Sequence, residues 1–128
     1  FELVISCPKG FEPQAELLAE NRDRVHIEHD PMAAASHTDL VVTDVWASMG
    51  QEDEQRERMQ HFANYQVNEA LMARANSDAL YMHCLPAHRG EEISHELMDA
   101  NDTVIWEEAE NRLHAQKALI EALLLANS

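Results

Sequence analysis

Residues 79–94, ALYMHCLPAHRGEEIS, pass from an apolar run into a loop that opens with a histidine, a cysteine and a Leu-Pro step. The run at residues 79–84 has the length and composition of a strand. Cys84 therefore stands at the mouth of a predicted strand, and two interpretations are open. The thiol is either a small apolar side chain of the core, or a group on a loop that faces a substrate. Beside a protonated His83, an exposed thiol is expected to gain thiolate character.

The same strand character recurs along the chain. β-branched or alternating apolar residues predict further strands at residues 2–7, 25–30, 39–46 and 103–106. Helices are predicted from Pro13, from Pro31 behind the N-cap Asp30, within residues 47–78, after the capping Ser94, and over residues 107–128. This alternation predicts an α/β fold, a Rossmann-like parallel sheet of about five strands with helices on both faces.

Length, charge and cysteine usage narrow the class of protein. A chain of 128 residues suits one domain. The formal net charge of −15 argues against nucleic acid and against an anionic membrane surface as partners. Two distant cysteines do not form a disulfide scaffold, so we expect a reducing, cytoplasmic location. No apolar run reaches the roughly 18 residues that a membrane helix needs.

Cofactor and metal motifs are weak. With Gly10, Gly50 and Gly90 as the only glycines, the sequence has no dinucleotide fingerprint, and it has no phosphate-binding P-loop. His83, Cys84 and His88 are metal-ligating residue types, but no second ligand cluster accompanies them. We therefore expect neither a cofactor nor a metal.

Polar residues follow three of the predicted strands, where ligands of α/β sheets bind. Asp44 and Ser48 suit an amino acid's ammonium and carboxylate, although a plain turn with a helix cap explains them too. Arg112 stands near the predicted start of the last helix, where the dipole disfavours a cation. An anionic ligand bound there would explain the cation. The glutamates before Arg112 are explained by the preference for acidic residues in the first turn of a helix.

Three stretches in this order resemble the second half of ornithine carbamoyltransferases: DVWASMGQE at residues 44–52, MHCLPAHRGEEI at 82–93 and EEAENRLHAQKALI at 107–120. The order Asp-x-x-x-Ser-Met-Gly, His-Cys-Leu-Pro, Glu-Asn-Arg is specific to that family. Related aspartate carbamoyltransferases have proline where Cys84 stands, so Cys84 favours the ornithine branch. The resemblance covers nearly the whole chain.

The resemblance implies a transfer of the carbamoyl group of carbamoyl phosphate to the δ-amine of ornithine, which gives citrulline and phosphate. It implies that ornithine is bound by Asp44, Ser48, Met49, Cys84 and Leu85. It implies that carbamoyl phosphate is bound by His83, Cys84, Leu85 and Arg112. Catalysis would rest on Cys84, Asp44 and Arg112, and the intact enzyme would be a homotrimer in arginine biosynthesis.

Some family features are not in this sequence. The carbamoyl phosphate motif Ser-x-Arg-Thr is absent, as are the family's first domain and the first strand and helix of the ornithine domain. We therefore expect residues 1–128 to be a truncated ornithine-binding domain, inactive alone, with residues 107–128 as its C-terminal helix. Two alternatives stay open: a non-catalytic α/β binding or interaction module, and a carbamoyltransferase for another amine acceptor.

Overall fold

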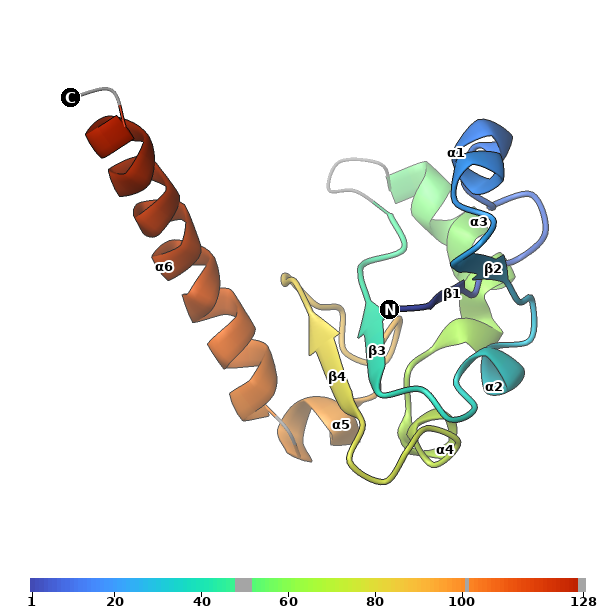
Figure 1. The fold of residues 1–128 in the computed structure, drawn as a ribbon. Helices are drawn as coiled ribbons and strands as arrows, with labels where there is room; N and C mark the ends of the chain where they lie inside the picture. The colour runs from blue at the N-terminus through green and yellow to red at the C-terminus, as the bar shows by residue number, and fades with distance from the viewer. Residues whose placement is uncertain (48–51, 101, 127–128) are drawn as a thin grey trace.

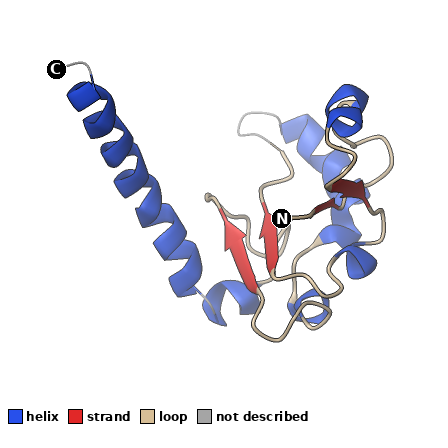
Figure 2. Ribbon diagram, in the orientation of Figure 1, coloured by secondary structure: helices blue, strands red, loops and turns tan. Residues whose placement is uncertain are grey.

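The computed structural model describes residues 1–47, 52–100 and 102–126. In this part of the chain, four short strands alternate with helices (Figures 1 and 2). The strands are β1 Leu3–Ile5, β2 Val25–Ile27, β3 Leu40–Thr43 and β4 Leu80–His83. The helices are α1 Ala15–Glu20, α2 Pro31–Ala34, α3 Glu52–Phe62, α4 Glu69–Met72, α5 His95–Ala100 and α6 Asp102–Ala126, with the 3-10 helix η1 Ala63–Tyr65 after α3.

The strands pair in parallel, as the alternation of strands and helices predicts. β1 pairs with β2, and β3 pairs with β4 in a register that sets Leu40 opposite Leu80 and Thr43 opposite His83. Within the described residues these are two separate two-stranded sheets. The α/β class with parallel strands is confirmed, whereas a single sheet of about five strands is not what these residues form.

The strand predicted at residues 103–106 is wrong, because these residues lie in the first turns of α6. A β-branched run favours a strand by itself, but here it continues into a long segment of good helix formers. Ile105 is fully buried in the core, and the Glu108 carboxylate accepts the main-chain N–H of His83 at 2.9 Å. The start of α6 thus covers β4 and accepts a hydrogen bond from it through the side chain of Glu108. A neighbouring strand would accept such a bond through its backbone carbonyls.

The core lies between the β3–β4 sheet and helices α4, α5 and the start of α6. Its buried members come from most of these elements: Ala35, Val67, Leu71, Tyr81, Ile93, Leu97, Met98 and Ile105. Side-chain caps fix the ends of the short helices. Asp30 Oδ1 accepts the N–H of Met32 at 2.9 Å, and Ser94 Oγ accepts the N–H of Leu97 at 3.1 Å. Both predicted caps are therefore confirmed, and each removes an unpaired donor from a helix start.

Apolar strand residues are unusually open. Parallel sheets are normally buried on both faces, yet Leu3 is exposed, and Val42 and Leu80 are 64% and 52% exposed. A cavity of about 410 Å³, lined by Leu3 and Val4 on one side and by Val41 and Thr43 on the other, lies between β1 and β3. The strands of this chain therefore have more apolar surface than the described residues cover.

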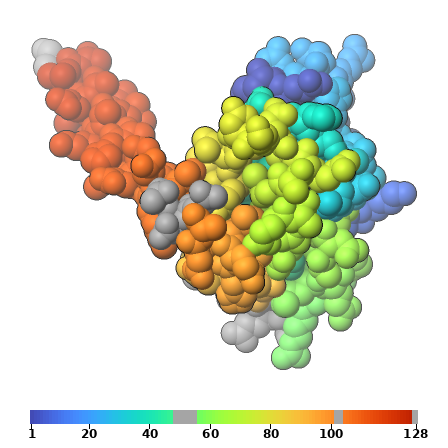
Figure 3. Space-filling model, turned by 90° about the horizontal axis from the view of Figure 1, so that it is seen from below, coloured from blue at the N-terminus to red at the C-terminus, as the bar shows by residue number. Residues whose placement is uncertain are grey.

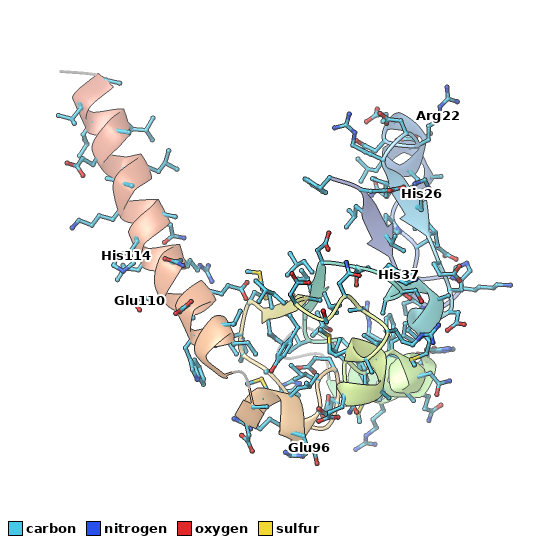
Figure 4. The ribbon with its side chains drawn as sticks, turned by 60° about the horizontal axis from the view of Figure 1, so that its bottom comes forward. Arg22, His26, His37, Glu96, Glu110 and His114 are labelled. Carbon is cyan, nitrogen blue, oxygen red and sulfur yellow. The ribbon has the colours of Figure 1, made fainter. Side chains whose placement is uncertain are left out.

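The far part of α6 stands away from the rest of the molecule (Figures 1 and 3). Beyond its first turns every described residue is exposed, including Leu113, Ile120 and Leu125. Glu110 and His114 lie one turn apart on the same helix and pair through His114 Nε2 and Glu110 Oε1 at 3.2 Å (Figure 4). Among the described residues, no helix combines the length and apolarity needed to cross a membrane.

The docking of α6 can be tested by two truncations on the same helix. In the 128-residue chain, Ile105→Ala removes a fully buried side chain and should lower the free energy of unfolding by about 2–5 kcal/mol. Leu113→Ala, at a position 66% exposed, should change it by less than about 0.5 kcal/mol. Urea denaturation measures both values. Equal effects of the two substitutions would contradict the observed packing.

Candidate functional site

Two side chains predicted for the site meet at the carboxyl ends of β3 and β4. Because Thr43 and His83 are paired in register, the residues that follow them, Asp44 and Cys84, leave the sheet side by side. The Cys84 sulfur and a carboxylate oxygen of Asp44 lie within 4.8 Å of each other, and Asp44 Oδ1 accepts the N–H of Val45 at 2.7 Å. Both side chains are exposed. The structure therefore places a carboxylate and a thiol on one open sheet edge.

The pKa of Cys84 differs from the expectation that its thiol would gain thiolate character. Partial desolvation, followed by the hydrogen bond and negative charge of Asp44, raises the pKa of Cys84 above its ordinary value. The neighbouring imidazole of His83 does not reverse this. One of its ring nitrogens lies within 4.8 Å of the sulfur, but the two nitrogens are bonded to Glu92 and to the N–H of Leu85. Cys84 is exposed, so the interpretation as an apolar core side chain is not what the structure shows.

His83 is fully buried and uses both ring nitrogens. Its Nε2 lies 3.0 Å from Oε1 of Glu92, which is also fully buried. Its Nδ1 accepts the N–H of Leu85 at 2.9 Å, so the ring proton resides on Nε2 and the imidazole is the neutral Nε2–H tautomer. The predicted contact of His83 with carbamoyl phosphate stays a prediction, and in this structure the ring has no exposed nitrogen.

Leu85 holds an uncommon backbone conformation. Its φ is 53°, in the left-handed region that costs a residue with a Cβ roughly 1–2 kcal/mol. The half-buried side chain packs against the core cluster, and the N–H is held by His83. These contacts offset the backbone strain and fix the direction in which Cys84 and the Leu85 main chain leave β4.

Of the remaining predicted site residues, only Arg112 lies in the part of the chain that the structure describes. Arg112 is exposed on α6, one turn beyond Glu108. Because α6 begins at Asp102, Arg112 is more than two turns inside the helix, and the argument from an unfavourable dipole at a helix start does not apply. Ser48 and Met49 lie outside the described residues.

Two buried or half-buried carboxylates were missed by the sequence reasoning. Glu92 supports His83, and Glu108 holds the main chain of β4. In the sequence, Glu92 stands beside a second glutamate, and no local pattern tells which of the two is buried. The contacts that distinguish them come from β4 and from the segment before α4, which are distant in the chain.

Two groups of possible metal ligands also appear: Asp44 with His83 and Cys84, and His88 with Glu91 and Glu92. In each group the ligand atoms lie within 4.8 Å of one another. His83 and Glu92, one member of each group, are hydrogen bonded to each other.

A polar cluster at the carboxyl ends of parallel strands defines the class of this protein: an α/β domain with its site at the strand ends. The family model of the aspartate/ornithine carbamoyltransferase Asp/Orn binding domain matches residues 1–123, and the chain belongs to this family.

The similar proteins come from the ornithine branch. The chain is 59% identical to the ornithine carbamoyltransferase of Hydrogenovibrio crunogenus over 97% of its own length and 41% of the relative's. It is 61% identical to that of Methylococcus capsulatus over 98% and 42%. The crystal structure of the anabolic ornithine carbamoyltransferase of Campylobacter jejuni superposes with a TM-score of 0.87 at 36% identity, over 96% of this chain and 43% of that one. The chain thus spans about two fifths of these relatives.

The charge of Asp44 can be tested through the reactivity of Cys84. Asp44→Asn removes the negative charge that disfavours the thiolate, so the pKa of Cys84 should fall and its alkylation at a fixed pH near 8 should become faster. Iodoacetamide labelling between pH 7 and 10, read by mass spectrometry at each cysteine, measures this. The buried Cys7, whose pKa is raised mainly by burial, is the internal reference. Slower labelling of Cys84 in the variant would contradict the assignment.

Proposed function

We propose that the whole protein is an ornithine carbamoyltransferase and that residues 1–128 are its ornithine-binding domain, without the carbamoyl phosphate domain. One observation carries this proposal: the Asp44 and Cys84 of two family motifs, 40 residues apart in the chain, come together at the ends of β3 and β4. The names of the relatives support the choice of ornithine as acceptor. The products are citrulline and phosphate, as in arginine biosynthesis.

The residues at the strand ends suit this reaction. The δ-amine must be neutral to attack the carbonyl carbon; the new C–N bond forms as the C–O bond to phosphate breaks, and the amine loses a proton. Asp44 would pair with the ammonium of the amino acid, with Ser48 and Met49 completing that side. Cys84, a neutral thiol, and Leu85 would lie beside the reacting amine and carbamoyl group. Arg112 would act on carbamoyl phosphate, where a cation stabilises the departing phosphate oxygens. His83, whose two ring nitrogens are bonded within the protein, would support this side through the position of Leu85.

The two strand pairs are also part of this proposal. We place both pairs in one parallel sheet of about five strands with helices on both faces, with a strand from the rest of the protein between β1 and β3. The cavity of about 410 Å³ at this position and the exposed Leu3 and Val42 support that arrangement. α6, which contains residues 107–126, is the C-terminal helix of the domain. We propose a homotrimer in the cytoplasm that needs no bound cofactor.

The need for the rest of the protein can be tested directly. The 128-residue chain, mixed at high concentration with ornithine and carbamoyl phosphate, should form no citrulline above a buffer blank, because the Ser-x-Arg-Thr phosphate motif is absent. The whole protein, assayed in parallel, should form citrulline. Turnover by the short chain would contradict the division of roles between domains.

The ammonium partner can be tested in the whole protein. Asp44→Asn removes an ion pair and should weaken ornithine binding by about 1.5–3 kcal/mol, or about 10- to 150-fold. Ser48→Ala removes a neutral hydrogen bond and should cost about 0.5–1.5 kcal/mol, or about 2- to 10-fold. Calorimetric titration with ornithine measures both. Equal losses in the two variants would argue against Asp44 as the ammonium partner.

A further inference from the structure

Glu92 is a buried carboxylate that closes the loop carrying Cys84. Its side chain is 0% exposed, and a single oxygen, Oε1, accepts both His83 Nε2–H at 3.0 Å and the main-chain N–H of His88 at 2.6 Å. The first and last residues of the loop at 83–88 are therefore tied to the same atom. A buried carboxylate is tolerated only when it is hydrogen bonded in this way.

The ionisation of Glu92 follows from the same contacts. Burial alone raises the pKa of its carboxyl group, but the hydrogen bonds from His83 and from the N–H of His88 more than offset burial, and its pKa lies below the ordinary value. At neutral pH the carboxylate is thus an acceptor only. Its other oxygen, Oε2, is buried and has no hydrogen-bond partner among the described residues.

The backbone around Glu92 is fixed from the opposite side. Val67 N–H donates to the Glu92 carbonyl at 2.9 Å, and Ser94 N–H donates to the Val67 carbonyl at 2.9 Å. The Gln66 side chain donates to the carbonyls of Gly90 and Glu91, both at 2.9 Å. Glu92 is therefore a rigid support, held by main-chain bonds that do not involve the loop it closes.

A directed chain of hydrogen bonds runs from this support to the strand end. Because Glu92 only accepts, His83 must carry its proton on Nε2, which leaves Nδ1 free to accept from Leu85 N–H at 2.9 Å. That bond holds Leu85 at φ 53°, and Cys84 lies between the two bonded residues. If the imidazole proton moved to Nδ1, it would face the Leu85 N–H, and the bond would be lost.

We propose that Glu92 is a positioning residue for carbamoyl transfer, which acts through the Nε2–H tautomer of His83 to hold Cys84 and Leu85 in the orientation that faces the substrates. This role rests on the proposed function of the whole protein. Glu92 does not touch the substrates and exchanges no proton with them. Its contribution is the acceptor atom, not the negative charge.

Substitutions at Glu92 separate the contribution of the acceptor atom from that of the negative charge in the whole enzyme. Glu92→Gln keeps an oxygen that accepts both N–H groups and places its NH₂ where Oε2 lies, so kcat should stay within about fivefold of the parent with an unchanged pH profile. Glu92→Ala removes the acceptor, and kcat should fall at least tenfold while KM for ornithine changes less.

Glu91→Ala, on the neighbouring half-buried carboxylate, is the matched control and should leave kcat within about twofold. An unchanged kcat in Glu92→Ala, or a loss in Glu92→Gln as large as in Glu92→Ala, overturns the proposal.

Two measurements do not depend on turnover. The ¹⁵N shifts of His83 in the parent enzyme should show a protonated Nε2 and an unprotonated Nδ1 at pH 7–8, and any other state overturns the proposal even if Glu92→Ala does not fold. Alkylation of Cys84 should change in rate in Glu92→Ala and match the parent in Glu92→Gln. If the parent forms no citrulline, the proposed function fails, while these two signatures still report whether Glu92 orders the loop.

Discussion

The parallel register of β3 with β4 is the constraint on which the site depends. It sets Thr43 opposite His83, so the next residues of the two strands, Asp44 and Cys84, lie next to each other. The backbone hydrogen bonds of the paired strands determine this arrangement, so it does not depend on contacts of the two side chains. The same register turns Tyr81 and His83 into the core, where Tyr81 donates to the Leu97 carbonyl of α5 and His83 meets Glu92.

Around this ladder, two carboxylates make defined hydrogen bonds to His83. The Glu108 carboxylate takes the free N–H of His83 at the edge of β4, and Glu92 takes the ring of the same residue. His83 is thus held through its main chain by α6 and through its side chain by the segment before α5. The start of α6 and the segment before α5 are therefore both coupled to the residue that precedes Cys84, and the position of the thiol depends on both.

The sequence allowed the α/β class, the caps at Asp30 and Ser94, and the position of Cys84 at a strand end to be predicted, because each follows from local patterns of a few residues. It did not allow the start of α6 to be placed: residues 103–105 are β-branched, and the burial of Ile105 against distant residues favours the helix. The thiolate character expected for Cys84 is contradicted by its raised pKa for a similar reason. Partial desolvation raises its pKa most, and the side chain that raises it further is Asp44, across the ladder, which no local pattern shows. Glu92 was missed because its partners come from three separate segments.

The exposed part of α6 has a consequence for how its helical structure is maintained. Tertiary contacts of the described residues reach only its first turns, so the later turns rely on helix propensity and local hydrogen bonds. Such a segment is marginally stable in water, and its amide hydrogens exchange through local fraying rather than through unfolding of the core. Leucines such as Leu113 and Leu125 gain stability only when another surface covers them. Helicity in this region is therefore thermodynamically linked to association, and any surface that covers these leucines will also lengthen the lifetime of the helix.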